Sequence, residues 1–129
     1  TMAGAEGWQI STPTILAMAA IKASLEIFNA AGMKELCNKS ALLTSYLEFL
    51  LQDLNSKKIS IITPKNIQSR GCQISIEISD PDKDFHKNLT DLGVITDWRD
   101  PNVIRCAPTP LYNSFTDVFM FVEKLKQLL

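Results

Sequence analysis

This chain of 129 residues has one histidine, three cysteines and three arginines, and these scarcities limit the chemistry that it can perform. His86 stands in a short amphipathic segment, which favours a solvated surface histidine over a general base. Cys37, Cys72 and Cys106 form neither a C-x-x-C pair nor a metal-ligand spacing with His86. We therefore expect no metal site, and three buried free thiols in a reducing cytoplasm.

Long apolar runs and basic clusters are also missing. The formal charge is −1 with scattered positive residues, so the sequence has no electrostatic footprint for nucleic acid. No apolar run approaches the roughly 20 residues of a membrane span. The first residues lack the basic-then-apolar layout of a signal peptide. The sequence predicts a cytoplasmic protein with no nucleic-acid partner and no membrane.

The usual catalytic motifs are absent as well. There is no glycine-rich phosphate loop of the G-x-x-x-x-G-K-[ST] type. Asp80, Asp82 and Asp84 flank a helix start, where negative charge is favoured in any case. The ten lysines fall mostly on polar helix faces or in loops, so none resembles a desolvated Schiff-base former. We expect no catalytic residue within this chain.

The apolar pattern predicts a small α+β domain. Helical spacing follows Pro13, with Ser11 or Thr12 as its cap and Ile15, Met18, Ile21, Leu25 and Phe28 on one face, and Gly32 ends it. Further helices are expected over about 33–54, between Asp82 and Gly93, and after a capping box at 114–117. Strands are expected at 59–62, 72–78, 94–98 and 103–107. This order predicts a mostly antiparallel sheet with helices packed on one side.

Arg105 is the strongest candidate for a binding residue. It lies in the apolar run 103–107, directly before the proline-spaced turn Pro108-Thr109-Pro110. A planar, permanently charged guanidinium held at a strand end suits bidentate capture of a carboxylate. A surface ion pair, or an aliphatic stem lying over apolar neighbours, explains the same residue.

The pair Ser11-Thr12 offers a second candidate site. Its hydroxyls and backbone N–H groups at a helix start provide a place for an anion or a phosphate. Plain helix capping by these residues is the alternative. The residues before them are punctuated by Gly4 and Gly7 and show no regular pattern, which indicates a connection arriving from elsewhere.

Four motifs resemble the C-terminal region of kynureninases. They are Gly7-Trp8-Gln9-Ile10-Ser11-Thr12-Pro13, Ala23-Ser24-Leu25-Glu26-Ile27-Phe28, Arg70-Gly71-Cys72-Gln73 and the stretch from Asp100 to Phe115. The resemblance covers essentially the whole chain, with matching order and spacing.

The resemblance implies the C-terminal domain of the aspartate-aminotransferase fold and a pyridoxal-phosphate enzyme that hydrolyses L-kynurenine to anthranilate and L-alanine. It also implies a role in tryptophan catabolism and NAD biosynthesis. The enzyme is implied to be a homodimer. Arg105 matches the arginine that binds the substrate's α-carboxylate, and Thr12 matches a cofactor-site position that is often asparagine. The Schiff-base lysine and most cofactor contacts are implied for an upstream large domain. Residues 1–12 would then connect from that domain, and 13–129 would form the small domain, inactive alone.

Two other functions remain open. One alternative to the enzyme domain is a free-standing module that senses an amino acid through Arg105. The other is an interaction domain whose first two helices pack against a partner.

Overall fold

The computed structural model describes residues 2–129, which divide into two units, one up to Met33 and one from Lys34 to Leu129. The first unit holds a short 3-10 helix, Ala5–Trp8, and the helix α1, Ile15–Ala31. The second unit contains every strand and the hydrophobic core.

The helix α1 begins later than the sequence predicts. Thr14 is its N-cap, with extended backbone (φ −74°, ψ 103°), and no side chain caps the helix. The prediction of Pro13 in the first turn with a cap at Ser11 or Thr12 is therefore wrong. No side chain or packed neighbour stabilises an additional turn there, and a short helical extension is unfavourable without one. Gly32 ends the helix as predicted, with a φ of 80° that suits glycine.

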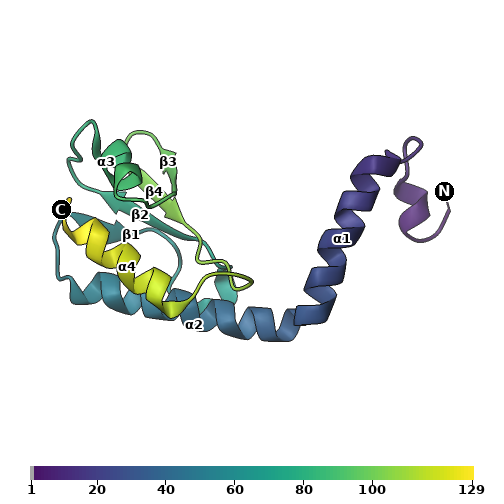
Figure 1. Ribbon diagram of the computed structural model, residues 1–129, viewed down its shortest axis with the longest axis horizontal. Coiled ribbons are helices and arrows are strands. Elements are labelled where there is room, and N and C mark those ends of the chain that lie inside the picture. The colour runs from purple at the N-terminus through teal and green to yellow at the C-terminus, as the bar shows by residue number, and fades with distance from the viewer. Residues whose placement is uncertain (1) are drawn as a thin grey trace. The chain divides into compact units, whose positions relative to one another are not determined.

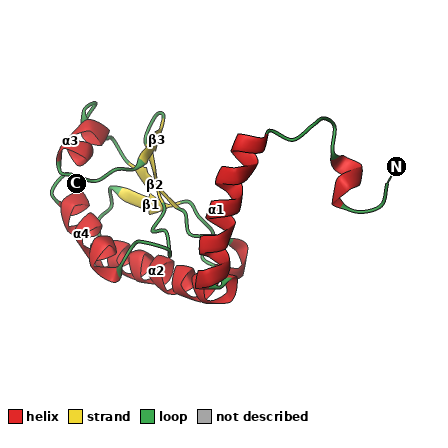
Figure 2. Cartoon of the chain, turned by 45° about the vertical axis from the view of Figure 1, so that its right-hand side comes forward, coloured by secondary structure: helices red, strands yellow, loops and turns green. Residues whose placement is uncertain are grey.

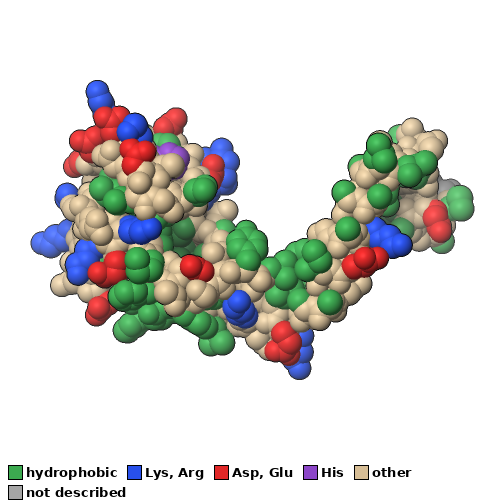
Figure 3. All heavy atoms as spheres, in the orientation of Figure 1, with side chains coloured by type: hydrophobic (Ala, Val, Ile, Leu, Met, Phe, Trp, Pro, Cys, Tyr) green, Lys and Arg blue, Asp and Glu red, His purple; other side chains and the backbone are tan. Residues whose placement is uncertain are grey.

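No residue of α1 is buried, although its sequence has the apolar spacing of a packed helix. Figure 3 shows hydrophobic side chains exposed along this helix. The exposed apolar side chains are Ile15, Leu16, Met18, Ile21, Leu25 and Ile27.

The second unit is built on a four-stranded antiparallel sheet in the order β1-β2-β4-β3, as Figure 1 shows. Its strands are β1, Ile59–Ile61; β2, Ile74–Ile78; β3, Asp97–Arg99; and β4, Val103–Cys106. Its helices are α2, Met33–Asp53; α3, Phe85–Asp91; and α4, Phe115–Lys126, with a short 3-10 turn at Ile67–Ser69. The predicted α+β class is confirmed.

The core lies between one face of the sheet and the three helices of this unit. Strand alternation turns Ile74, Ile76 and Ile78 of β2 inward, and Ile104 and Cys106 of β4 follow the same rule. The helices contribute Leu43, Leu47, Leu51, Phe85, Leu89, Val118, Val122 and Leu125. Figure 2 shows α2 and α4 running beside each other under the strands. The opposite face of the sheet carries no helix of this unit.

The strand predicted at 94–98 is shorter than expected and begins later. Residues 94–96 are not in a strand, because the Val94 N–H donates to the carbonyl of Leu89 and so closes the end of α3. The ladder begins at Asp97, which pairs with Arg105 of β4.

Two of the three cysteines are not buried as predicted. Cys37 is exposed because α2 turns Leu36 and Leu43 to the core and leaves Cys37 on another face. Cys72 is half-buried because it precedes β2 and lies outside the strand. All three thiols are free, as expected.

Several aromatic and aliphatic residues of the helices are also more exposed than their spacing suggests. Tyr46 of α2 packs edge-on against Phe115 of α4, with ring centroids 5.7 Å apart. Leu42, Phe49, Phe115 and Phe119 lie outside the core on these two helices.

Within residues 2–129, no single helix is both long and apolar enough to cross a membrane. The helices α1 and α2 reach that length and composition only when counted together across the break at Gly32.

Candidate functional site

Arg105 lies on the open face of the sheet. It is the third residue of β4, and its neighbours Ile104 and Cys106 point into the core. Alternation along the strand therefore sends the Arg105 side chain to the opposite face. In the ladder it is paired with Ser75 of β2 on one side and Asp97 of β3 on the other.

The Arg105 guanidinium is paired with Asp97. Nε of Arg105 donates a hydrogen bond to Oδ2 of Asp97, and Nη2 forms an ion pair with the same oxygen. Arg99 donates its Nε to that oxygen as well, at 3.0 Å. The arginine side chain keeps about a third of its surface in contact with solvent, 34%. The sequence suggested either a surface ion pair or a carboxylate site, and the structure contains the ion pair.

This ion pair affects the ionisation of Asp97. The hydrogen bond from Arg105 is the largest cause that lowers the pKa of Asp97 from its ordinary value of 3.8. Desolvation opposes it, and the charges of Arg105 and Arg99 reinforce the lowering. Asp97 therefore remains a carboxylate at neutral pH.

The turn after β4 is fixed by hydrogen bonds, which holds the end of the strand in place. The Thr109 N–H donates to Oδ1 of Asn113 at 2.7 Å, and the Asn113 N–H donates back to the Thr109 carbonyl at 2.8 Å. Lys39 of α2 donates its Nζ to the carbonyl of Pro110 at 2.7 Å. The rigid turn that the prolines predict beside Arg105 is therefore present.

The helix after this turn starts at the predicted capping box. The Ser114 hydroxyl accepts from the Asp117 N–H, and the Asp117 side chain accepts from the Ser114 N–H. This exchange satisfies two donors that a helix start otherwise leaves unpaired. It anchors α4 directly behind the turn that follows Arg105.

The strand β2, on the other side of Arg105 from β3, is held by hydroxyl and backbone groups. Ser75, the β2 partner of Arg105, donates its N–H to Oγ1 of Thr63 at 2.8 Å, and its carbonyl accepts from the Ile62 N–H at 2.9 Å. These bonds extend the β1–β2 pairing beyond the strand ends. Arg105 is thus flanked on both sides by strands in fixed register.

Thr12 lies in the first unit, in an exposed segment before α1 that has neither helix nor strand. Its hydroxyl does not cap the helix, because Thr14 occupies the N-cap position. The capping explanation for Ser11 and Thr12 is therefore wrong. Thr12 and Arg105 belong to different units.

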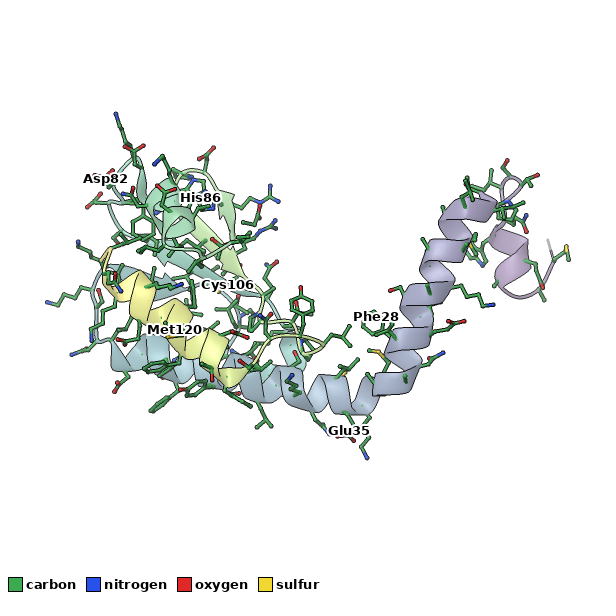
Figure 4. All side chains as sticks on the ribbon, in the orientation of Figure 1. Phe28, Glu35, Asp82, His86, Cys106 and Met120 are labelled. Carbon is green, nitrogen blue, oxygen red and sulfur yellow. The ribbon has the colours of Figure 1, made fainter. Side chains whose placement is uncertain are left out.

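Two other side chains of chemical interest, Cys106 and His86, pack within the second unit. Burial raises the pKa of the Cys106 thiol to about 12, so Cys106 is no nucleophile at neutral pH. His86 is half-buried, which corrects the expectation of a solvated histidine. Its ring stacks on Trp98 with centroids 5.8 Å apart, and its Nε2 lies 3.2 Å from the Thr96 carbonyl (labelled with Cys106 in Figure 4).

No lysine among residues 2–129 is buried, and no group of three His, Cys, Asp or Glu side chains there is arranged to hold a metal ion. A lysine that forms a Schiff base at neutral pH needs desolvation or a neighbouring cation to lower its pKa.

The buried ion pair between Arg70 and Glu48 was not predicted from the sequence. Arg70 Nη1 donates to Glu48 Oε2 at 2.7 Å, with the two side chains only 2% and 14% exposed. Arg70 also donates to the Pro64 carbonyl, so it ties the loop between β1 and β2 to α2. A charged residue in a polar loop gives no local sign of burial, although Arg70 belongs to one of the motifs that carried the family resemblance.

Comparison with known sequences identifies the family. Residues 36–125 match the family described as the kynureninase C-terminal domain. The chain belongs to this family. Arg105 lies within the matched residues and Thr12 lies outside them.

Individual kynureninases are similar over nearly the whole chain. The kynureninase of Myxococcus xanthus is 50% identical over 123 residues, which cover 95% of this chain and 29% of the relative. Human kynureninase is 46% identical over 134 residues, covering 98% of this chain and 29% of the relative. The chain thus spans less than a third of the length of these kynureninases.

Proposed function

We propose that this chain is the small C-terminal domain of a kynureninase, a pyridoxal-phosphate enzyme that hydrolyses L-kynurenine to anthranilate and L-alanine. The observation that carries the proposal is Arg105 on the open sheet face, within the residues that match the family. In this proposal its guanidinium binds the α-carboxylate of kynurenine.

A guanidinium on a fixed strand contributes by orientation. A bidentate pair with a carboxylate sets both the position and the plane of the amino acid, and the fixed register of β2, β3 and β4 limits the movement of the anchor. Pyridoxal phosphate, when bound, supplies the electron sink for the bond cleavage. This chain's residues would hold the substrate against it.

The residues present fit a peripheral part in cofactor binding. The Thr12 hydroxyl lies in an exposed segment and is not used for capping, so it can reach a bound group. The absence of a buried lysine among residues 2–129 supports placing the Schiff-base lysine in a large domain of a longer chain. As part of the proposal, that longer enzyme is a cytoplasmic homodimer, and the chain alone does not hydrolyse kynurenine.

A chimaera tests the proposal: this chain replaces the matching segment of the Myxococcus xanthus kynureninase. We expect kynurenine hydrolysis by the unsubstituted chimaera. Arg105→Lys keeps the charge but loses the fork, and a lost charged hydrogen bond predicts a rise in KM of about 10–100-fold. Lys87→Gln, which removes an exposed cation from α3, serves as the control and should leave KM unchanged.

A soluble chimaera that binds pyridoxal phosphate but lacks activity would contradict the family function. An active chimaera with near-normal KM in Arg105→Lys would remove Arg105 from the substrate site. Calorimetry with amino acids on the chain alone tests the sensor alternative, because the sensor function requires binding without any large domain.

A further inference from the structure

The Arg105 guanidinium has two edges that can bind an oxygen pair, and only one of them is occupied. The side edge, formed by Nε and Nη2, points at Oδ2 of Asp97. The outer edge, formed by Nη1 and the second hydrogen of Nη2, has no hydrogen-bond partner within residues 2–129. A free outer edge is a complete fork for one incoming carboxylate.

The sheet register makes this arrangement stable. Asp97 and Arg105 are direct cross-strand partners on the same face, a placement that brings side chains into contact without any loop movement. Arg99, two residues along β3, contacts the same oxygen of Asp97 at 3.0 Å. Asp97 is therefore held from two sides, and the three charges sum to one net positive charge beside the free edge.

An exposed ion pair of this kind contributes little to the stability of a fold. Its consequence for a flexible side chain is larger, because a long arginine otherwise samples many rotamers and loses that freedom when it binds a ligand. A guanidinium already held along its side edge loses less freedom on binding.

We propose that Asp97 is a positioning residue that holds the side edge of Arg105 and thereby presents the outer edge to the carboxylate of the amino-acid substrate. This inference depends on the proposed role of Arg105 as the carboxylate anchor. Asp97 itself does not touch the substrate. The arrangement makes the site selective for two coplanar oxygens, since a carboxamide offers one acceptor and a repelling N–H group.

The experiment uses the chimaera with substitutions at Asp97 and measures KM and kcat for L-kynurenine. It also measures inhibition by L-alanine and L-alaninamide, a matched pair with and without the carboxylate. Asp97→Ala should raise KM about tenfold, because the guanidinium must then lose its rotamer freedom when it binds the carboxylate. The preference for alanine over alaninamide should fall by a similar factor.

Two further variants separate positioning from simple support of the fold. Asp97→Asn retains an oxygen acceptor and should lose less of the preference than Asp97→Ala. Asp91→Ala removes a carboxylate from the exposed pair with Lys87 and should leave both measurements unchanged. In an Arg105→Gln background, Asp97→Ala should have no additional effect, because the side chain that it positions is gone.

The outcomes distinguish the two proposals. If Arg105→Gln leaves the alanine preference intact, the proposed role of Arg105 is wrong. If Arg105→Gln abolishes the preference and Asp97→Ala does not change it, only the inference on Asp97 is wrong. If Asp97→Ala fails to fold, Asp97→Asn replaces it in the kinetic test.

The exchange rate of the Arg105 Nε–H with water, measured in a nitrogen-15 NMR spectrum of the chain, is a second test. Positioning requires that this hydrogen exchanges slowly in the parent chain and faster in Asp97→Asn.

Discussion

At the scale of single residues, the buried pair of Arg70 and Glu48 is the interaction whose loss should cost most. The loop between β1 and β2 is long, and Arg70 joins it to α2 through one short charged hydrogen bond. Removing either partner leaves the other as an uncompensated charge in a region with little solvent.

We predict that Glu48→Met lowers the free energy of unfolding by about 3 kcal/mol, measured by urea denaturation of the chain. The double variant Glu48→Met with Arg70→Met should recover part of this loss, because no buried charge then remains. Lys87→Met, at an exposed pair, is the control and should have no measurable effect. Equal losses in the single and double variants would show that the ion pair is not the cause.

At the scale of elements, α4 depends on its capping box. The box begins the helix immediately after the turn that fixes β4, and the helix contributes Val118, Val122 and Leu125 to the core. Hydrogen bonds from the backbone and hydroxyl of Ser114 are the main causes that lower the pKa of Asp117 from its ordinary value of 3.8.

This pKa shift has a predictable sign. A carboxyl whose pKa is lower in the folded state stabilises the fold above its ordinary pKa, and the contribution disappears as the pH falls through the lowered value. We therefore predict that Asp117→Asn unfolds more easily than the parent chain at pH 7, and that the difference shrinks steadily below pH 3.8. Urea unfolding at a series of pH values measures it. A difference that is independent of pH would mean that the charge of Asp117 is not involved.

The helix α1 illustrates a different property of elements. Its sequence contains the apolar spacing of a buried helix, yet none of its residues is buried. Periodicity records which side chains share a face, and it does not record what covers that face. In a chain that spans 29% of its relatives' length, such a face agrees with the proposal that a large domain belongs to the complete enzyme.

At the scale of the whole molecule, the second unit contains the hydrophobic core and the entire sheet. We predict that a chain beginning at Lys34 unfolds cooperatively, with a melting temperature within about 2 °C of the parent, because neither helix before Lys34 has a buried residue. A loss of about 1 kcal/mol would lower the melting temperature by several degrees, so the measurement is sensitive enough. Differential scanning calorimetry measures this. A much lower melting temperature would show that residues before Lys34 contribute to the core.

The sequence by itself determined the elements with strong local patterns. Alternation at Ile74, Ile76 and Ile78 placed β2, the Ser114–Asp117 box placed the start of α4, and Gly32 marked the end of α1. These features depend on neighbours within a few residues, so the amino-acid sequence alone is enough to predict them.

Only the tertiary structure determined which charged side chains pair with one another. Asp97 contacts Arg105 because β3 and β4 pair in one register, and Glu48 contacts Arg70 because a loop folds back onto α2. The start of α1 and the shift of β3 to Asp97 were likewise decided by which hydrogen bonds the surroundings supply. Contacts between residues far apart in the chain arise from packing, and many arrangements of the same local elements satisfy one amino-acid pattern equally well.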